Sequence, residues 1–90
     1  MVVESRPRLA KRARLRFDRA TQRWILLAPA RGLVLSWSAS AVLMLCTGER
    51  SLAEIVDQLA AEHHAPRARL ERDVLGLMTA LETRGLVEVM

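Results

Sequence analysis

The sequence has few of the residues on which most catalytic and metal sites depend. It contains one cysteine, Cys46, and one histidine pair, His63-His64. A single cysteine cannot form an internal disulfide, which fits a reducing cytoplasm. Adjacent helical residues point about 100° apart, so neighbouring histidines do not readily share one metal ion. Since phosphate-binding glycine loops, Gly-x-Ser-x-Gly turns and paired catalytic carboxylates are also missing, we predict a binding module that is not an enzyme and needs no metal or cofactor.

Long apolar runs are missing as well. No run approaches the roughly 20 residues that span a bilayer, and the N-terminal eight residues lack the apolar core of a secretory signal. Apolar residues make up 51% of the 90-residue chain, which is typical of a folded globular protein. We expect one cytoplasmic domain over residues 12–90, preceded by an extended arm over residues 1–11, with no membrane partner.

Positive charge is concentrated in the N-terminal third. Residues 1–31 contain nine arginines or lysines against two acidic residues, whereas residues 32–90 contain five arginines against eight acidic residues. A basic half suggests an anionic partner, either nucleic acid or an acidic peptide. A solvated strand face explains the same charge without any partner, so charge alone does not decide between these interpretations.

Strand patterns occupy the first half of the chain. In residues 13–18, leucine and phenylalanine alternate with arginine, which is the period of a half-buried strand. Residues 23–28 form a second strand that is apolar on both faces. Since helices would cover only one face, we expect Trp24, Leu26 or their neighbours to meet either the N-terminal arm or another subunit, as in a homodimer. Residues 33–35 are the third strand.

Helical patterns occupy the second half. Three helices are expected, over residues 38–47, 52–63 and 66–84. A capping box, Ser51-Leu-Ala-Glu54, opens the second helix, and residues 86–89 are expected to add a short strand. The order of elements predicts an α+β fold of the winged helix-turn-helix type, in which a three-stranded antiparallel sheet precedes three helices.

A winged helix raises the alternative of a nucleic-acid-binding protein. The third helix carries four arginines, but acidic residues lie among them, and the chain contains no asparagine and only two glutamines. Interleaved carboxylates repel the phosphate backbone, and amide side chains are among the groups that read base edges. The sequence therefore favours a partner other than nucleic acid.

The third strand offers a site for a peptide. If it lies at the sheet edge, residues Leu33-Val34-Leu35 present unpaired backbone groups without charge or proline to block strand addition. An acidic amphipathic peptide would suit Arg31, Arg69 and Arg72. The alternative is that a helix or a second copy of the chain covers this edge.

Several motifs, in order and spacing, resemble the PqqD family of peptide chaperones. They span residues 6–87 and are Arg6-Pro-Arg-Leu, Arg14-Leu-Arg-Phe-Asp18, Arg23-Trp-Ile-Leu-Leu-Ala-Pro29, Leu45-Cys-Thr-Gly48, Ser51-Leu-Ala-Glu-Ile-Val56, Asp73-Val-Leu and Arg84-Gly-Leu86. The resemblance implies the fold of a recognition element for ribosomally synthesised and post-translationally modified peptides (a RiPP recognition element). It also implies a role in pyrroloquinoline quinone (PQQ) biosynthesis. It also implies that the chain binds the precursor peptide PqqA and presents it to the radical S-adenosylmethionine enzyme PqqE.

The resemblance further implies where the peptide lies. In this fold class the peptide pairs along the third strand and packs on the third helix. Carried over, the contacts on the strand are Gly32, Leu33, Val34 and Leu35, next to Arg31 of the charge argument, and those on the helix are Arg69, Arg72, Asp73, Leu75, Gly76 and Thr79. A glycine inside a helix costs about 1 kcal/mol relative to alanine. Gly76 is explained either by close approach of the peptide or by tight packing of the helix on the sheet.

Overall fold

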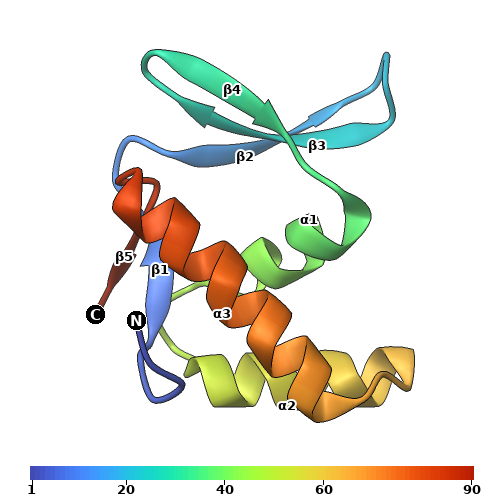
Figure 1. Cartoon of the computed structure of the whole chain (residues 1–90). Coiled ribbons are helices and arrows are strands. Elements are labelled where there is room, and N and C mark those ends of the chain that lie inside the picture. The colour runs from blue at the N-terminus through green and yellow to red at the C-terminus, as the bar shows by residue number, and fades with distance from the viewer.

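Four strands, three helices and a last short strand follow one another in the computed structural model, which describes residues 1–90 (Figure 1). The strands are β1 (Pro7–Leu9), β2 (Arg14–Asp18), β3 (Arg23–Ala28), β4 (Arg31–Val34) and β5 (Val87–Val89), and the helices are α1 (Trp37–Met44), α2 (Leu52–His63) and α3 (Arg67–Thr83). Strands β2, β3 and β4 form one antiparallel sheet, while β1 and β5 form a second, two-stranded one. The predicted three-stranded sheet followed by three helices is confirmed.

The three-stranded sheet has one face toward the helices and one toward solvent. Leu26 pairs with Leu15 and Leu33, and its side chain is only 1% exposed on the inner face. Trp24 also packs against the core. Because side chains alternate along a strand, Ile25 and Leu27 lie on the outer face, where both remain half-buried. The chain's own core thus covers Trp24 and Leu26, and it is their neighbours that face outward.

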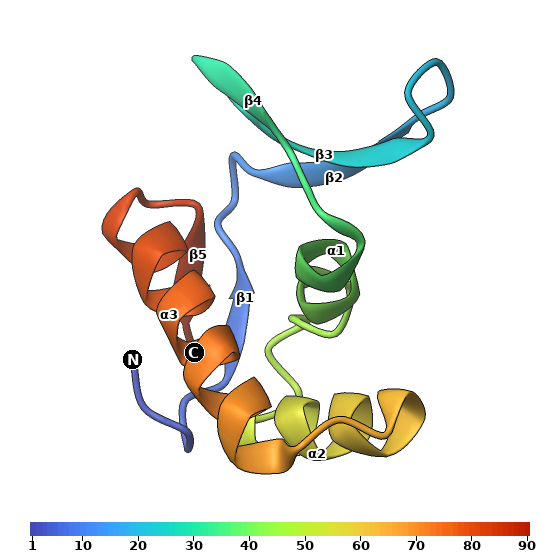
Figure 2. The same cartoon turned by 45° about the vertical axis from the view of Figure 1, so that its right-hand side comes forward.

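The N-terminal segment is tied into the fold along its length. β1 pairs with β5 in the register Arg8↔Glu88, and the guanidinium Nε of Arg8 donates to Glu88 at 2.7 Å. The first amide groups of α2 donate to the carbonyls of Val3 and Ser5 at 2.9 Å, so residues 1–11 also satisfy a helix N-terminus. Figures 1 and 2 place β1 on the helix side of the three-stranded sheet. Only Pro7–Leu9 of this segment forms a strand, and the segment does not cover Ile25 and Leu27.

The helix starts follow local capping. The Ser36 hydroxyl accepts from the amide of Ala39 at 3.1 Å, so α1 begins at Trp37, one residue earlier than predicted. In the capping box of α2, the Ser51 hydroxyl accepts from the Glu54 amide at 3.1 Å and the Glu54 carboxylate accepts from the Ser51 amide at 2.8 Å. The capping box predicted from sequence is therefore confirmed.

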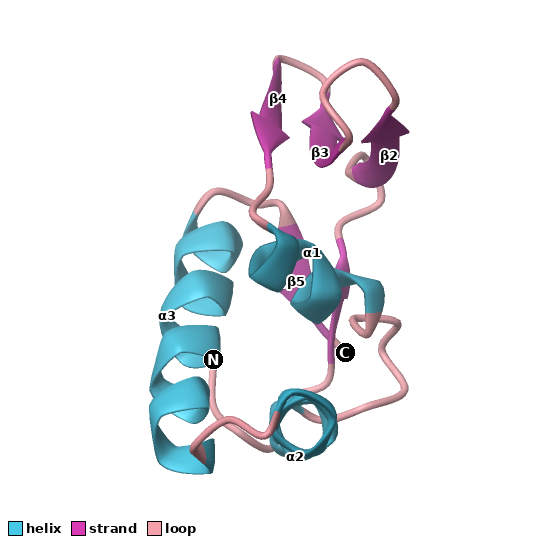
Figure 3. Cartoon of the chain, turned by 90° about the vertical axis from the view of Figure 1, so that its right-hand side faces the viewer, coloured by secondary structure: helices cyan, strands magenta, loops and turns pink.

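A single apolar core joins the helices to the sheet. Figure 3 shows the helices lying below β2, β3 and β4. The buried members of the core on the helices are Val42, Leu43, Leu52, Ile55, Val56, Leu59, Val74, Met78 and Leu81. The spacing of three and four residues gives α2 and α3 one buried stripe each, whereas α1 buries the adjacent Val42 and Leu43. Because the buried stripe of α3 packs into the core, it determines which flank of that helix is exposed beside β4. No helix is long and apolar enough to cross a membrane.

Candidate functional site

The outer edge of β4 has no strand partner. β4 is the last strand of the β2–β3–β4 order. Leu35, directly after β4, donates its amide to the Trp24 carbonyl at 2.9 Å. Since inward and outward backbone groups alternate in antiparallel pairs, Gly32 and Val34 turn their N–H and C=O groups away from β3. The edge predicted from the sequence is therefore present, with two residues ready to pair with an added strand.

The opposite edge of the sheet differs in charge. β2 carries Arg14 and Arg16 at alternate positions, and both side chains are exposed. Charged side chains on an edge strand disfavour the addition of another strand. Along β4, by contrast, only the first residue is charged, and the Val34 side chain is 67% exposed. The sheet thus has one blocked edge and one open edge.

Two cavities lie along α3, one beside the start of α1 and one beside the β3–β4 turn, and we call the space that they bound the β4–α3 groove. One cavity, of about 240 Å³, is lined by Ser36, Ser38, Ala39, Val42, Asp73, Val74 and Leu77. The other, of about 300 Å³, is lined by Ala28, Pro29, Ala30, Arg31, Arg84 and Leu86. The C-terminal end of α3 lies below the β3–β4 turn in Figures 1 and 2, so the second cavity marks that end of the groove.

The six helix residues implied by the family resemblance lie on different sides of α3. Asp73 lines the groove. Leu75 is two residues on, about 200° around the helix, and is half-buried on the flank away from Asp73. The other four are exposed: Arg69 and Gly76 lie within about 60° of Asp73, whereas Arg72 and Thr79 lie about 100° or more away.

The structure brings further residues to the groove. Leu77 and Arg84 are four and eleven residues after Asp73, which places all three on one stripe of the helix. In the sequence, this stripe could have been found from the helical spacing, because Leu77 follows Asp73 by four residues and Arg84 follows Leu77 by seven. At the end of β4, Trp37 opens α1 with its side chain 58% exposed, and large exposed aromatic side chains are frequent anchors in binding sites.

Gly76 does not serve packing within the chain. A Cβ atom built at this position would meet no atom within 4 Å. Tight packing of the helix on the sheet, the second of the two explanations for this glycine, is therefore excluded in the isolated chain. Gly32 differs, since a Cβ there would approach Ile25 Cγ2 at 3.2 Å on the outer face of the sheet.

The residues most often used in catalysis are dispersed or buried. Burial raises the pKa of the Cys46 thiol to about 12, and its Sγ donates to the Val42 carbonyl at 3.3 Å. A thiol held protonated in this way is a poor nucleophile. No group of three or more His, Cys, Asp or Glu side chains is placed to hold a metal ion. What the site offers is hydrogen bonding along β4 and side-chain contacts from α1 and α3.

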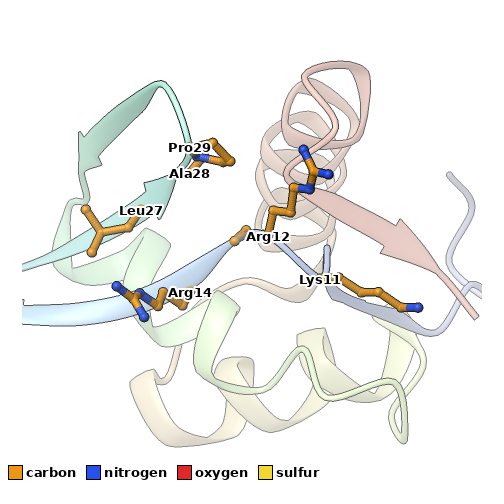
Figure 4. A pocket seen from close by; sticks show the side chains of 7 residues that line it. Lys11, Arg12, Arg14, Leu27, Ala28 and Pro29 are labelled. Carbon is orange, nitrogen blue, oxygen red and sulfur yellow. The ribbon is translucent and has the colours of Figure 1, made fainter.

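The largest cavity, of about 400 Å³, lies elsewhere and is basic. Lys11, Arg12 and Arg14 line it together with Leu27 and the start of the β3–β4 turn. Figure 4 shows the three cationic side chains pointing in different directions. Because they do not converge on one point, they do not form a compact anion site.

Solved structures define the class of this fold. The solution structure of the PqqD part of Methylobacterium extorquens PqqCD, described as a functional and stand-alone RiPP recognition element, has a TM-score of 0.80 and 35% sequence identity, and covers 91% of this chain and 87% of that one. The crystal structure of PqqD from Xanthomonas campestris has a TM-score of 0.59 and 39% identity, with 93% of each chain covered. The fold is that of a RiPP recognition element.

Sequence comparisons then identify the family. The profile described as "Coenzyme PQQ synthesis protein D (PqqD)" matches residues 23–87. A PqqA binding protein of Rhodopseudomonas palustris strain BisB5 is 43% identical over 83 residues, which cover 92% of this chain and 81% of that protein. One from Xanthomonas axonopodis pv. citri is 42% identical over 86 residues, covering 96% and 94%. The chain belongs to the PqqD family, whose members named here are binding proteins rather than enzymes.

Proposed function

We propose that this chain is a peptide carrier in PQQ synthesis, which binds the precursor peptide PqqA and delivers it to the radical S-adenosylmethionine enzyme PqqE. The observation that carries the proposal is the open edge of β4 above the β4–α3 groove. An extended peptide pairs with Gly32 and Val34 through its backbone and places every second side chain in the groove. The names of the relatives support PqqA as that peptide.

The groove supports recognition of an amphipathic peptide. Leu77, Val42 and Ala39 provide apolar contacts at one end, while Arg31 and Arg84 provide positive charge at the other. Arg69 and Arg72 are exposed on α3 and add charge for an acidic peptide. Backbone pairing supplies affinity, and the alternating side-chain contacts supply specificity.

Delivery requires only moderate affinity for the peptide. Holding a peptide on a carrier that also contacts the enzyme raises the effective concentration of the peptide at the enzyme. Since the chain offers no catalytic group, its contribution to the reaction is to bind, orient and release. A second copy of the chain on the outer face, over Ile25 and Leu27, stays a prediction that sedimentation measurements test.

The structure gives little support to the alternative of nucleic-acid binding. In α3, Arg67 donates to the carboxylates of Asp57 and Glu71, so this cation is already neutralised within the chain. Phosphate contacts require free cations that converge on one surface. We expect no shift of a generic DNA duplex in a gel at low salt.

Three measurements test the proposal. Calorimetric titration of the chain with synthetic PqqA should give saturable binding at one peptide per chain. Modification of PqqA by PqqE should then depend on the chain, and a second titration should detect a ternary complex. Absence of binding to PqqA would overturn the proposal, and binding without any effect on modification would remove the delivery step.

A further inference from the structure

Two arginines from distant parts of the sequence line one end of the β4–α3 groove. Arg31 is the first residue of β4, and Arg84 is the C-cap residue directly after α3. Both line the cavity of about 300 Å³, together with the apolar or backbone surfaces of Ala28, Pro29, Ala30 and Leu86. Two positive charges at one cavity repel each other unless an anion lies between them.

No carboxylate of the chain neutralises either arginine. The ion pairs of the structure use other cations: the N-terminus, Arg6, Arg8 and Arg67. The acidic residues nearest to Arg84 in sequence are engaged elsewhere, since Glu82 pairs with the Met1 amino group and Glu88 with Arg8. The charge at this cavity is therefore left for a ligand.

A role within the helix explains only one of the two arginines. Positive charge at the C-terminal end of a helix interacts favourably with the last carbonyl groups, and Arg84 occupies that place on α3. Arg31 has no comparable role, because it begins an edge strand and no carboxylate contacts it. The feature that Arg31 and Arg84 share is that they line the same cavity.

We propose that Arg31 and Arg84 form a carboxylate subsite, which holds one acidic side chain of the bound peptide. This inference rests on the proposed peptide-carrier function and deepens it. A guanidinium fork matches a carboxylate with two parallel hydrogen bonds, and a partly apolar cavity strengthens such a pair relative to open solvent. The occupant is thus an aspartate or glutamate side chain of the peptide.

The other end of the groove has the opposite charge and sets the direction of the peptide. Asp73 lines the cavity beside Ser36 and Ser38, and no cation of the chain pairs with it. From Arg31 to Leu35, an extended strand advances about 13 Å over four residues. An acidic side chain at the Arg31 end therefore lies about four residues from the position facing Asp73, where a second carboxylate is repelled.

A double-mutant cycle tests the subsite. The variants Arg31→Gln and Arg84→Gln remove one charge each and keep most of the side-chain length, and Arg19→Gln in the β2–β3 turn is the matched control. Each is titrated with PqqA and with PqqA variants in which one acidic residue at a time is replaced by its amide. We expect each groove substitution to weaken binding about three- to tenfold, with little effect of Arg19→Gln.

The expected coupling is confined to one peptide position. When the acidic residue at that position is replaced by its amide, binding to the Arg84→Gln variant should be no weaker than binding with either change alone. Equal affinity of the wild-type chain and both groove variants for PqqA would overturn the subsite while leaving peptide binding intact. No binding of PqqA to the wild-type chain would instead refute the peptide-carrier function. If a peptide with an amidated C-terminus loses the coupling, the terminal carboxylate is the ligand and the side-chain assignment is wrong.

Discussion

Leu35 donates its backbone amide to the carbonyl of Trp24 at 2.9 Å. This bond shows which residues of β4 direct their backbone groups at β3, because residues that bond to a neighbouring strand alternate with residues whose groups point away from it. Val34, one residue earlier, therefore presents its own amide to the open edge, although its Cα is paired with Ile25. The bond between Leu35 and Trp24 thus determines which residues can pair with a peptide.

Proline at position 34 should prevent peptide binding without unfolding the chain. Val34→Pro removes an amide that points outward, so the β3–β4 bonds remain and only pairing with an added strand is lost. We expect affinity for PqqA to fall more than tenfold in calorimetry, with an unchanged far-ultraviolet circular dichroism spectrum.

Two further variants separate the lost amide from other effects of proline. Val34→Thr keeps the amide and the branched shape and should bind within about twofold of wild type. Leu33→Pro removes an amide directed at β3 and should lower stability as well as binding. Unchanged affinity of a folded Val34→Pro variant would contradict edge addition.

Leu77 and Leu75 provide a matched pair of substitutions on one helix. Leu77 lines the groove, whereas Leu75 lies on the opposite flank of α3. Both are half-buried, so each change to alanine should cost up to about 2 kcal/mol of stability. Only Leu77→Ala should also weaken peptide binding, about five- to tenfold, when both variants are titrated below their melting temperatures. A larger loss with Leu75→Ala would place the peptide on the other flank.

Gly76→Ala should stabilise the free chain and weaken its complex. Alanine is favoured over glycine in a helix by about 1 kcal/mol, and a Cβ here meets no atom of the chain. The melting temperature should rise by roughly 4–8 °C for a domain of this size. Peptide affinity should fall if the peptide approaches the helix at Gly76. Gly85→Ala is the control, since its φ of +73° strains alanine and should lower stability instead.

Cys46 should make stability decline at alkaline pH. Its folded-state pKa, raised by burial to about 12, lies well above the unfolded value of about 8.5. The protonated thiol's contribution to the free energy of unfolding is fully present below pH 8.5. It is lost as pH rises toward 12, because the thiol of the unfolded chain ionises first. Between pH 9 and 11, the free energy of unfolding measured with urea should fall by roughly 1 kcal/mol more per pH unit for wild type than for Cys46→Ala. Parallel pH profiles would show that the thiol is accessible and titrates normally.

Helices and strands were predictable where neighbouring residues in the sequence carry the signal. Periodicity and the Ser51–Glu54 capping box predicted α2 with its observed bounds, and the alternation of residues 13–18 predicted β2 to within one residue. The pairing of β1 with β5 was not predicted. A short strand was expected at residues 86–89, but its partner β1 has only three residues, too few for an alternation to indicate a strand, and lies about 80 positions away.

The sequence pointed to the elements of the candidate site, β4 and α3, but not to the flank of α3 that lines the groove. The open edge of β4 follows from the order of strands, which a hairpin and an added strand suggest. Which flank of α3 faces β4 depends on how the helix is rotated about its buried stripe. That rotation is set by packing with α2 and the sheet, so the sequence did not distinguish Leu75 from Leu77.

Amide hydrogen exchange along β4, with and without PqqA, tests the central claim most directly. In the free chain, the amides of Gly32 and Val34 should exchange fast, while those of Leu33 and Leu35, which point to β3, should exchange slowly. Bound peptide should protect Gly32 and Val34 strongly and change Leu33 and Leu35 little. Saturating peptide that leaves Gly32 and Val34 unprotected, or that protects β2 instead, would contradict strand addition at this edge.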